Sequence, residues 1–274
     1  MKTAIITADD FGVSAEVNVA VEQAHRAGIL TVTSLMVTGV AAADAVMRAR
    51  ANPTLGVGLH IALAEVSPAL PRSDIPDLVD ANGMFRIESL PVALALVARA
   101  SVRAQLEAEI DAQFALFAAT GLPLDHVNTH KHMHMHPVIA ATLLKVGKRH
   151  GMKAVRAPIE DRAPLAAFER VGGIDIARPF ARHVQRSARA KGMKVPDRVF
   201  GLAWSGAMHS ERLRGVLDHL PEGVSEIYLH PATGPYPLSA PGYQYEAELA
   251  ALLDPLAQEI VRRRGITLAR FADL

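Results

Sequence analysis

Residues 3–28 read TAIITADDFGVSAEVNVAVEQAHRAG and contain both halves of a unit that recurs along the chain. The first seven residues form a short apolar run rich in β-branched side chains, which is typical of a strand buried on both faces. Ser14 can cap a helix, the following valines and alanines supply its apolar side, and Gly28 can end it. The stretch therefore predicts a buried strand over 3–9 and a helix over 14–28.

The alternation of apolar strand and amphipathic helix continues through most of the 274 residues. Further strands are expected at 31–39, 55–63, 124–130, 153–158, 197–205, 225–231 and 266–271. Further helices are expected at 41–52, 101–121, 136–151, 209–219 and 243–263. This order predicts an α/β domain with mostly parallel strands, in a sheet that is either open or closed into a barrel.

Two segments interrupt the alternation. Residues 64–90 are rich in Pro, Asp and Gly, and residues 159–196 are rich in Arg with apolar patches. Both are long for connections, so we expect insertions that act as lids or bind substrate. The prediction is one domain over 1–274 that carries these two insertions.

Composition excludes several classes of protein. Half of the residues are hydrophobic, and 29 Lys and Arg balance 28 Asp and Glu. Because no basic block stands out, a nucleic-acid partner is not indicated. The chain has no cysteine, which excludes a disulfide scaffold and thiolate-bound zinc, so any metal must be held by His, Asp or Glu.

The N-terminal sequence MKTAIITADDFG lacks the long apolar region and cleavage site of a signal peptide. No stretch approaches the roughly 18 uncharged apolar residues of a membrane span. We therefore expect a cytoplasmic protein, and peripheral contact with a membrane stays open. The oligomeric state, a homodimer included, stays open as well.

Chemically capable side chains fall at the carboxyl ends of the expected strands. They are Asp9, Asp10, His60, His130, Arg156, Trp204 and His230. In a parallel α/β fold these ends converge on one face, where ligands bind. Singly, each residue has an ordinary explanation, such as acids in a turn or a buried histidine bonded to backbone. Acids and three histidines on one rim form a coherent site.

The sequence NTHKHMHMHP at 128–137 places four histidines on alternate positions. They are His130, His132, His134 and His136. A solvated tract that binds metal adventitiously is the simplest explanation. However, this run lies between an expected strand and Pro137, which suits the first turn of a helix.

If the strand continues, a period of two places His126, Asn128 and His130 on one side, facing the barrel interior. We expect His130 to bind the metal, and His132 or His134 to contact substrate or to support the ligands. Alternation prevents all four histidines from reaching one ion.

One Asp and two His supply three protein ligands and leave coordination positions open, which is typical of a catalytic metal site. Imidazole with carboxylate suits one divalent ion, zinc first, with nickel, cobalt, manganese or magnesium as alternatives. A neighbouring carboxylate can take a proton from water, and a histidine opposite can protonate a leaving amine. The pattern predicts metal-assisted hydrolysis of an amide, with one of the two adjacent acids as ligand and the other as base.

Six motifs together carry a resemblance. They are ADDFG (8–12), TSLMV (33–37), GLHIAL (58–63), HVNTHKHMHMHP (126–137), YLHP (228–231) and the terminal ITLARFADL. In this order, over nearly the whole chain, they resemble the YdjC-type carbohydrate deacetylases, which are similar in site design to polysaccharide deacetylases. The resemblance implies a distorted (β/α) barrel that removes the N-acetyl group from an acetylated amino sugar.

The resemblance also implies roles. Asp9 matches the general base and His230 the general acid, whereas the metal ligands are Asp10, His60 and His130. We expect further contacts with the substrate from the polar and aromatic residues of the same rim, His132, His134, Arg156 and Trp204.

One position departs from the family pattern. Members commonly carry Asp-Ser before the metal-binding histidine, whereas this chain has Asn128-Thr129, so a charged acceptor becomes a neutral amide. The histidine run, with FGLAWSG and YLHPATG, resembles the subgroup associated with hopanoid biosynthesis, which implies an N-acetylglucosaminyl hopanoid as substrate. Apolar residues in 159–208, among them Ile174 and Ile176, fit either a channel for such a lipid or ordinary core.

Other functions remain open at this stage. The substrate could be a soluble chitooligosaccharide. A hydrolase of another class, including a glycoside-cleaving enzyme, could use the same rim. A non-enzymatic carrier of metal or lipid could use the histidines for storage, and would then need no base at Asp9.

Overall fold

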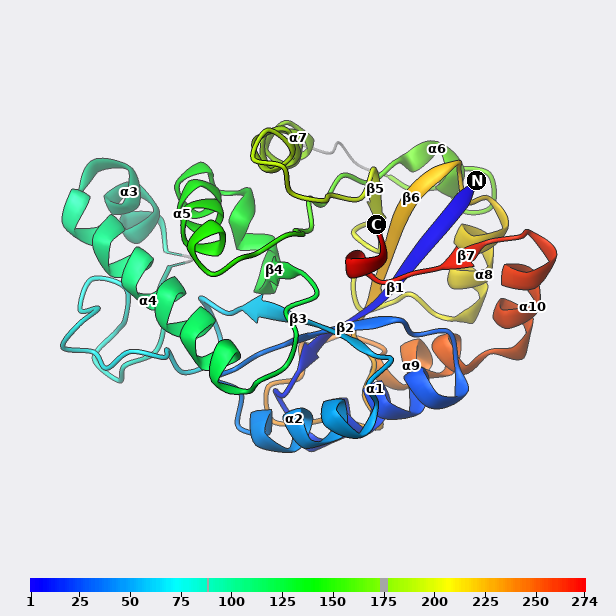
Figure 1. Ribbon diagram of the computed structural model, residues 1–274, viewed down its shortest axis with the longest axis horizontal. Helices are drawn as coiled ribbons and strands as arrows, with labels where there is room; N and C mark the ends of the chain where they lie inside the picture. Colours follow the sequence, from blue (N-terminus) through cyan, green and yellow to red (C-terminus); the bar gives the residue numbers. More distant parts are fainter. Residues whose placement is uncertain (88, 173–176) are drawn as a thin grey trace.

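The computed structural model describes residues 1–87, 89–172 and 177–274. Within these, a seven-stranded parallel sheet has the order β4-β3-β2-β1-β6-β5, and β7 pairs with the start of β1. The strands are β1 (Lys2–Phe11), β2 (Val32–Leu35), β3 (Gly56–Ile61), β4 (Val127–Thr129), β5 (Arg198–Phe200), β6 (Gly223–Leu229) and β7 (Thr267–Leu268). The predicted α/β class and the parallel strands are confirmed (Figure 1).

The segment 153–159 completes a distorted barrel. Arg156 N–H donates to Val127 O in β4 at 3.0 Å, and Val199 N–H in β5 donates to Ile159 O at 2.8 Å. The regular strand predicted at 153–158 is wrong, because the segment forms only isolated bridges to its neighbours. Pro158 explains the interruption, since proline has no N–H to donate to a ladder.

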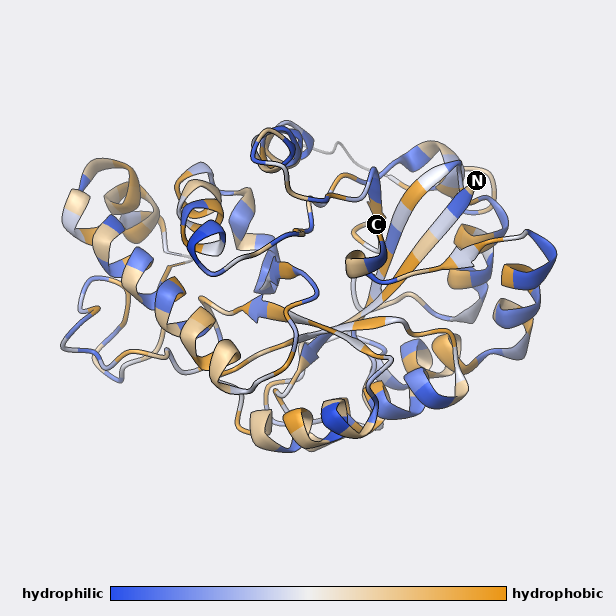
Figure 2. Ribbon diagram, in the orientation of Figure 1, coloured by the Kyte–Doolittle hydropathy of each residue, from blue (hydrophilic) through white to orange (hydrophobic). Residues whose placement is uncertain are grey.

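Helices cover the strands on the outside. The predicted helices appear as α1 (Ala15–Ala27), α2 (Ala42–Ala51), α4 (Ala100–Ala119), α5 (Pro137–Arg149), α8 (Ser210–Asp218), α9 (Tyr245–Leu253) and α10 (Pro255–Arg263). Those absent from the prediction are α3 (Leu90–Ala98), α6 (Arg162–Leu165), α7 (Arg178–Arg189) and the 3₁₀ turns η1 (His130–Met135) and η2 (Phe271–Asp273). Figure 2 shows hydrophobic and hydrophilic residues alternating along α1 and α2, as their amphipathic sequences require.

Local chemistry sets where the helices begin and end. The Ser14 hydroxyl accepts from Val17 N–H at the start of α1, as expected, and Gly28 follows its end. The single helix predicted over 243–263 is wrong, because it divides into α9 and α10 at Asp254–Pro255. The residue before a proline avoids the helical region, and Asp254 has an extended ψ of 118° while its side chain caps α10.

The first insertion is tied to the barrel. Buried Glu109 of α4 accepts hydrogen bonds from the backbone N–H groups of Ala69 and Leu70, at 2.8 and 3.0 Å. Ile75 and Leu78 of the same insertion are buried in the main core. The first insertion is therefore anchored between Ala69 and Leu78, and its predicted role as a lid stays a prediction.

The second insertion carries α6 and α7 on the outside of the barrel (Figure 1). The apolar residues Met193, Val195, Phe200 and Trp204 all belong to the main core, which favours ordinary core over a lipid channel. Ile174 and Ile176 lie outside the described residues. Among the helices of the described ranges, none has the length and apolar character needed to cross a membrane.

Candidate active site

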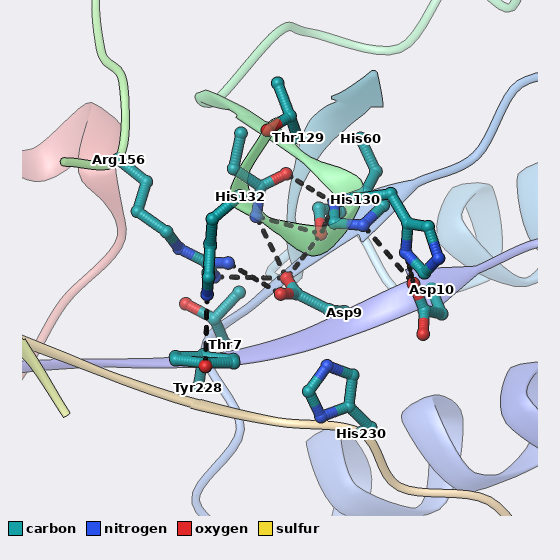
Figure 3. A network of polar contacts seen from close by, with 12 residues as sticks. Thr7, Asp9, Asp10, His60, Thr129, His130, His132, Arg156, Tyr228 and His230 are labelled. Atoms are coloured by element: carbon teal, nitrogen blue, oxygen red, sulfur yellow. Dashed lines mark hydrogen bonds and ion pairs between the residues drawn. The ribbon is translucent and has the colours of Figure 1, made fainter. Parts of the chain in front are cut away.

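Two adjacent acids at the end of β1 point in different directions. The pairing of β1 with β2 shifts register between Ala8 and Phe11, and Asp10 has a φ of 66°, which is uncommon for a residue other than glycine. As a result, Asp9 faces Arg156 whereas Asp10 faces His130 (Figure 3). Strain of this kind is kept where the surrounding structure holds a functional residue in place.

Asp10, His60 and His130 converge although they come from the ends of three strands. The Asp10 Oδ1 atom lies 3.2 Å from His60 Nε2 and 3.1 Å from His130 Nδ1, and the three ligand atoms lie within 4.8 Å of one another. Ligands about 2.0–2.1 Å from a tetrahedral ion stand about 3.3 Å apart. Buried His60 Nε2 forms no hydrogen bond among the described residues. These side chains fit a divalent metal.

Each histidine of this triad is held through its other ring nitrogen. His60 Nδ1 lies 2.6 Å from Asn128 Oδ1, and His130 Nε2 lies 2.9 Å from Glu65 Oε2. Such partners orient a metal-binding imidazole and choose its tautomer. Glu65 was not among the predicted site residues. The one feature of the sequence that points to it is that it is an acid four residues beyond the end of β3, within an irregular segment.

The charges of this cluster shift its ionisation in the absence of metal. Hydrogen bonding from His130 lowers the pKa of Glu65 to about 2, against the opposing effect of burial, with a further contribution from Lys131. Burial would lower the pKa of His130, but the Asp10 carboxylate and then Glu65 raise it to about 10. The two carboxylates therefore favour the protonated form of His130.

Asp9 is held by a buried network behind the triad. Arg156 binds both of its carboxylate oxygens, at 2.6 and 3.0 Å, and Ser34 and Asn128 donate to Oδ1 at 2.7 and 2.9 Å. Burial would raise the pKa of Asp9, but the Arg156 guanidinium holds it far below its ordinary value. Asp9 is therefore ionised throughout the physiological range.

Arg156 and His134 lie beneath the cavity rather than in it. Arg156 is fully buried and also binds Glu226 Oε1, at 2.7 Å. His134 is fully buried, 2.6 Å from Thr129 Oγ1 and 3.0 Å from the Arg156 carbonyl oxygen. Because both side chains are buried beneath the cavity, their positions differ from the predicted contact with substrate. Arg156 holds Asp9 in place, and His134 holds the backbone at Arg156.

The histidine run is a turn and not a continuing strand. β4 ends at Thr129, and Lys131 and His132 adopt left-handed φ values of 53° and 51°. His126 does face the interior side, as expected: its ring fills the space beside Gly58, on the same face of β3 as His60, and stacks on the Phe271 ring, 4.2 Å away, below the triad.

The four histidines consequently serve four different purposes. His130 joins the triad, while His132 Nε2 lies 3.1 Å from the Tyr228 hydroxyl on the cavity wall. His134 is buried, and His136 accepts a bond from Val138 N–H at the start of α5.

His230 lies across the cavity from the triad (Figure 3). Its backbone N–H donates to the buried carboxylate of Glu248 at 2.5 Å, and its Nδ1 lies 3.9 Å from the same oxygen. Sequence reasoning missed Glu248, which reads as one of several acids along an amphipathic helix. The carboxylate fixes the end of β6 and therefore the position of the His230 ring.

Tyrosines form much of the wall of this cavity of about 140 Å³. All four in the chain line it, namely Tyr228, Tyr236, Tyr243 and Tyr245. Such rings offer flat apolar faces and hydroxyl groups, which suit a sugar. Trp204, a predicted contact, lies outside the lining and packs against Phe168 and Arg212.

The chain is similar to known proteins over most of its length. The model of the YdjC-like protein family matches residues 3–263. A carbohydrate deacetylase from Geobacillus stearothermophilus is 30% identical over 98% of this chain and 96% of its own length. Another from Brevibacillus brevis is 39% identical, over 53% of this chain and 56% of that relative.

A solved structure supports the same relationship. A crystal structure from Enterococcus faecalis V583, described as a candidate cellobiose-phosphate cleavage protein, superposes with a TM-score of 0.79 at 25% identity, covering 99% of this chain and 98% of that one. Given the extent of these matches, the chain belongs to the YdjC-like protein family.

Proposed function

We propose that the protein is a metal-dependent hydrolase that removes the N-acetyl group from an acetylated amino sugar. The observation that carries the proposal is the convergence of Asp10, His60 and His130 beside Asp9, with His230 on the opposite wall. Carbohydrate deacetylases among the relatives support the class of reaction. Asp10, His60 and His130 would hold the ion, zinc first.

A bound divalent ion would supply Lewis-acid polarisation of the acetyl carbonyl and a more acidic water. The chain supplies the proton transfers. Asp9 is ionised and fixed by Arg156, so its carboxylate is available to take a proton from water that attacks the acetyl carbon. As the C–N bond breaks, His230 donates a proton to the sugar nitrogen, and acetate and a free amine leave.

We further propose a lipid-linked amino sugar, an N-acetylglucosaminyl hopanoid, as the substrate, with a soluble chitooligosaccharide as the alternative. The lipid-linked substrate is supported by the resemblance of the histidine run and the two later motifs to the hopanoid-associated subgroup. The histidines and tyrosines of the cavity offer hydrogen-bonding groups and apolar ring faces that suit the acetamido end of either molecule.

The test incubates the zinc-loaded protein separately with N-acetylglucosaminyl hopanoid, diacetylchitobiose and N-acetylglucosamine, and measures acetate release and product mass. We expect acetate from the hopanoid, and loss of activity with a chelator and in Asp10→Ala and His130→Ala. His183→Ala is the matched control, because His183 is an exposed histidine on α7.

Three results would overturn parts of the proposal. Acetate from diacetylchitobiose alone would replace the lipid-linked substrate with the soluble one. Glycosidic cleavage without acetate would identify a hydrolase of another class. Binding of several metal ions per chain, unchanged by Asp9→Asn and without release of acetate, would identify a metal carrier.

A further inference from the structure

Asn128, at the centre of β4, contacts both halves of the site through its side chain. Its Oδ1 lies 2.6 Å from His60 Nδ1, and its Nδ2 lies 2.9 Å from Asp9 Oδ1 and 3.2 Å from Ser34 Oγ. The residue is fully buried. Among the side chains described in this network, Ser34 is the only other one that contacts both a triad histidine and Asp9.

The charges decide which way the carboxamide points. Both Asp9 oxygens accept hydrogen bonds from the Arg156 guanidinium, so an amide oxygen 2.9 Å from Asp9 would be repelled and the amide nitrogen must face it. The amide oxygen therefore faces His60 and can only accept. This forces the proton of His60 onto Nδ1 and leaves the Nε2 lone pair directed at Asp10 and His130.

We propose that Asn128 is a positioning residue that couples the two halves of the site: its oxygen selects the His60 tautomer able to bind metal, and its amide group fixes the Asp9 carboxylate. The proposal rests on the metal-dependent function proposed above. An acid at this position could hold His60 equally well but, when ionised, could not donate to Asp9. The amide thus gives this chain one more donor to Asp9 than an acid would.

Two substitutions separate the roles of the two amide atoms. Asn128→Asp is nearly isosteric, keeps an acceptor for His60 and loses the donor to Asp9. We expect nearly native zinc affinity with kcat lowered at least about tenfold at unchanged KM, because misplacement of a catalytic group costs turnover. Asn128→Leu loses both contacts, so we expect zinc affinity to fall about 10- to 100-fold together with kcat.

Zinc affinity is measured by competition with a chromophoric chelator, and folding by circular dichroism. Asn52→Leu is the control, because Asn52 is another buried carboxamide, placed after α2 and away from the triad. Native zinc affinity in a folded Asn128→Leu, or native kcat in Asn128→Asp, would overturn the proposal. Equal losses of affinity in both variants would indicate a merely structural role and overturn it too.

If the Leu variant does not fold, the Asp variant alone still decides, because its zinc affinity and kcat are expected to diverge. The affinity measurement requires no substrate. Absence of acetate release by the native protein would therefore reject the proposed function, while the effect of Asn128 on zinc would still be tested.

Discussion

Arg156 is the residue on which the buried charges of the site depend. It lies between Asp9 and Glu226, each of which accepts from its guanidinium, and Thr7 adds a further donor to Glu226 at 2.8 Å. All of these groups are buried. Breaking a buried ion pair costs far more than forming it gains, because the remaining charge has no solvent to stabilise it.

We therefore expect Arg156→Met to lower the free energy of unfolding by about 3–5 kcal/mol, since it leaves two buried carboxylates without a counter-charge. Arg156→Lys keeps the charge but cannot bind both Asp9 oxygens at once, so kcat is expected to fall while the loss of stability is smaller. Urea unfolding and steady-state kinetics measure the two effects.

Arg263→Met is the matched control, because Arg263 pairs with Asp218 on the surface. An exposed pair contributes at most about 1 kcal/mol. If Arg156→Met and Arg263→Met cost the same, the structural role given to Arg156 is wrong.

The site residues that could be predicted from the sequence are those at the carboxyl ends of the parallel strands. Asp9, Asp10, His60, His130 and His230 were all placed on one rim by the parallel topology, and they do lie around one cavity. Glu65 and the tyrosines beyond β6 could not be placed in this way. Glu65, Tyr236 and Tyr243 lie in irregular segments, and Tyr245 only begins α9; the paths of such segments depend on tertiary contacts that have no periodic signal in the sequence.

At the scale of elements, η1 shows why the histidine run could not be interpreted by strand periodicity. Two consecutive residues with left-handed φ kink the chain directly after β4, and neither is a glycine. The turn is stabilised by Thr129, whose hydroxyl lies 2.6 Å from His134 Nδ1 and accepts from the His134 N–H at 3.1 Å. His134 therefore acts as an anchor of the turn.

His134 should make stability depend on pH. Burial first, and then the charge of Arg156, lower its pKa to about 4. In the unfolded chain its pKa is about 6.5, so between pH 6.5 and about 4 the unfolded state binds a proton that the folded state does not. The contribution of neutral His134 is therefore complete above pH 6.5 and declines as the pH falls.

We expect the stability advantage of the native protein over His134→Gln, which does not titrate, to decrease between pH 7 and pH 4 in urea unfolding. His183→Gln is the control, because His183 is exposed on α7. An advantage over His134→Gln that does not change with pH would contradict the neutral, buried state of His134.

A second contact between elements involves the loop after β5 and the segment before α9. Gly206, with a φ of 75°, lies under the Tyr243 ring, and a methyl group there would stand 2.2 Å from the Tyr243 Cγ. The Tyr243 hydroxyl lies 3.0 Å from Ser205 Oγ. The absence of a side chain at Gly206 thus lets Tyr243 form part of the cavity wall.

Gly206→Ala is expected to displace Tyr243 and raise KM severalfold while zinc affinity is unchanged. Gly242→Ala provides a close control, because Gly242 also has a positive φ of 84° but would place its methyl group in open space. Both variants carry the backbone strain, so only the steric effect differs. Equal KM values in the two variants would contradict the role of Tyr243.

On the scale of the whole molecule, the order of strands and helices was sufficient to predict a parallel α/β fold. It was not sufficient to predict the closure of the barrel. Closure depends on segment 153–159, whose hydrogen bonds reach β4 on one side and β5 on the other. Pro158 removes the regular pairing that a strand pattern implies. The resemblance of the motifs, rather than periodicity, provided the expectation of a distorted barrel.

The proposed metal ligands come from parts of the chain that are distant in sequence, because Asp10 and His60 lie near the ends of β1 and β3, and His130 follows β4. An ion bound only by the folded state must stabilise the whole barrel.

At a zinc concentration 100 times the Kd, we expect the free energy of unfolding to rise by about 2.7 kcal/mol over the chelated protein. Thermal unfolding with EDTA and with zinc measures this gain, which Asp10→Ala and His60→Ala should abolish and His183→Ala should preserve. An equal gain in Asp10→Ala would mean that zinc binds elsewhere, and the triad would lose its role in both stability and catalysis.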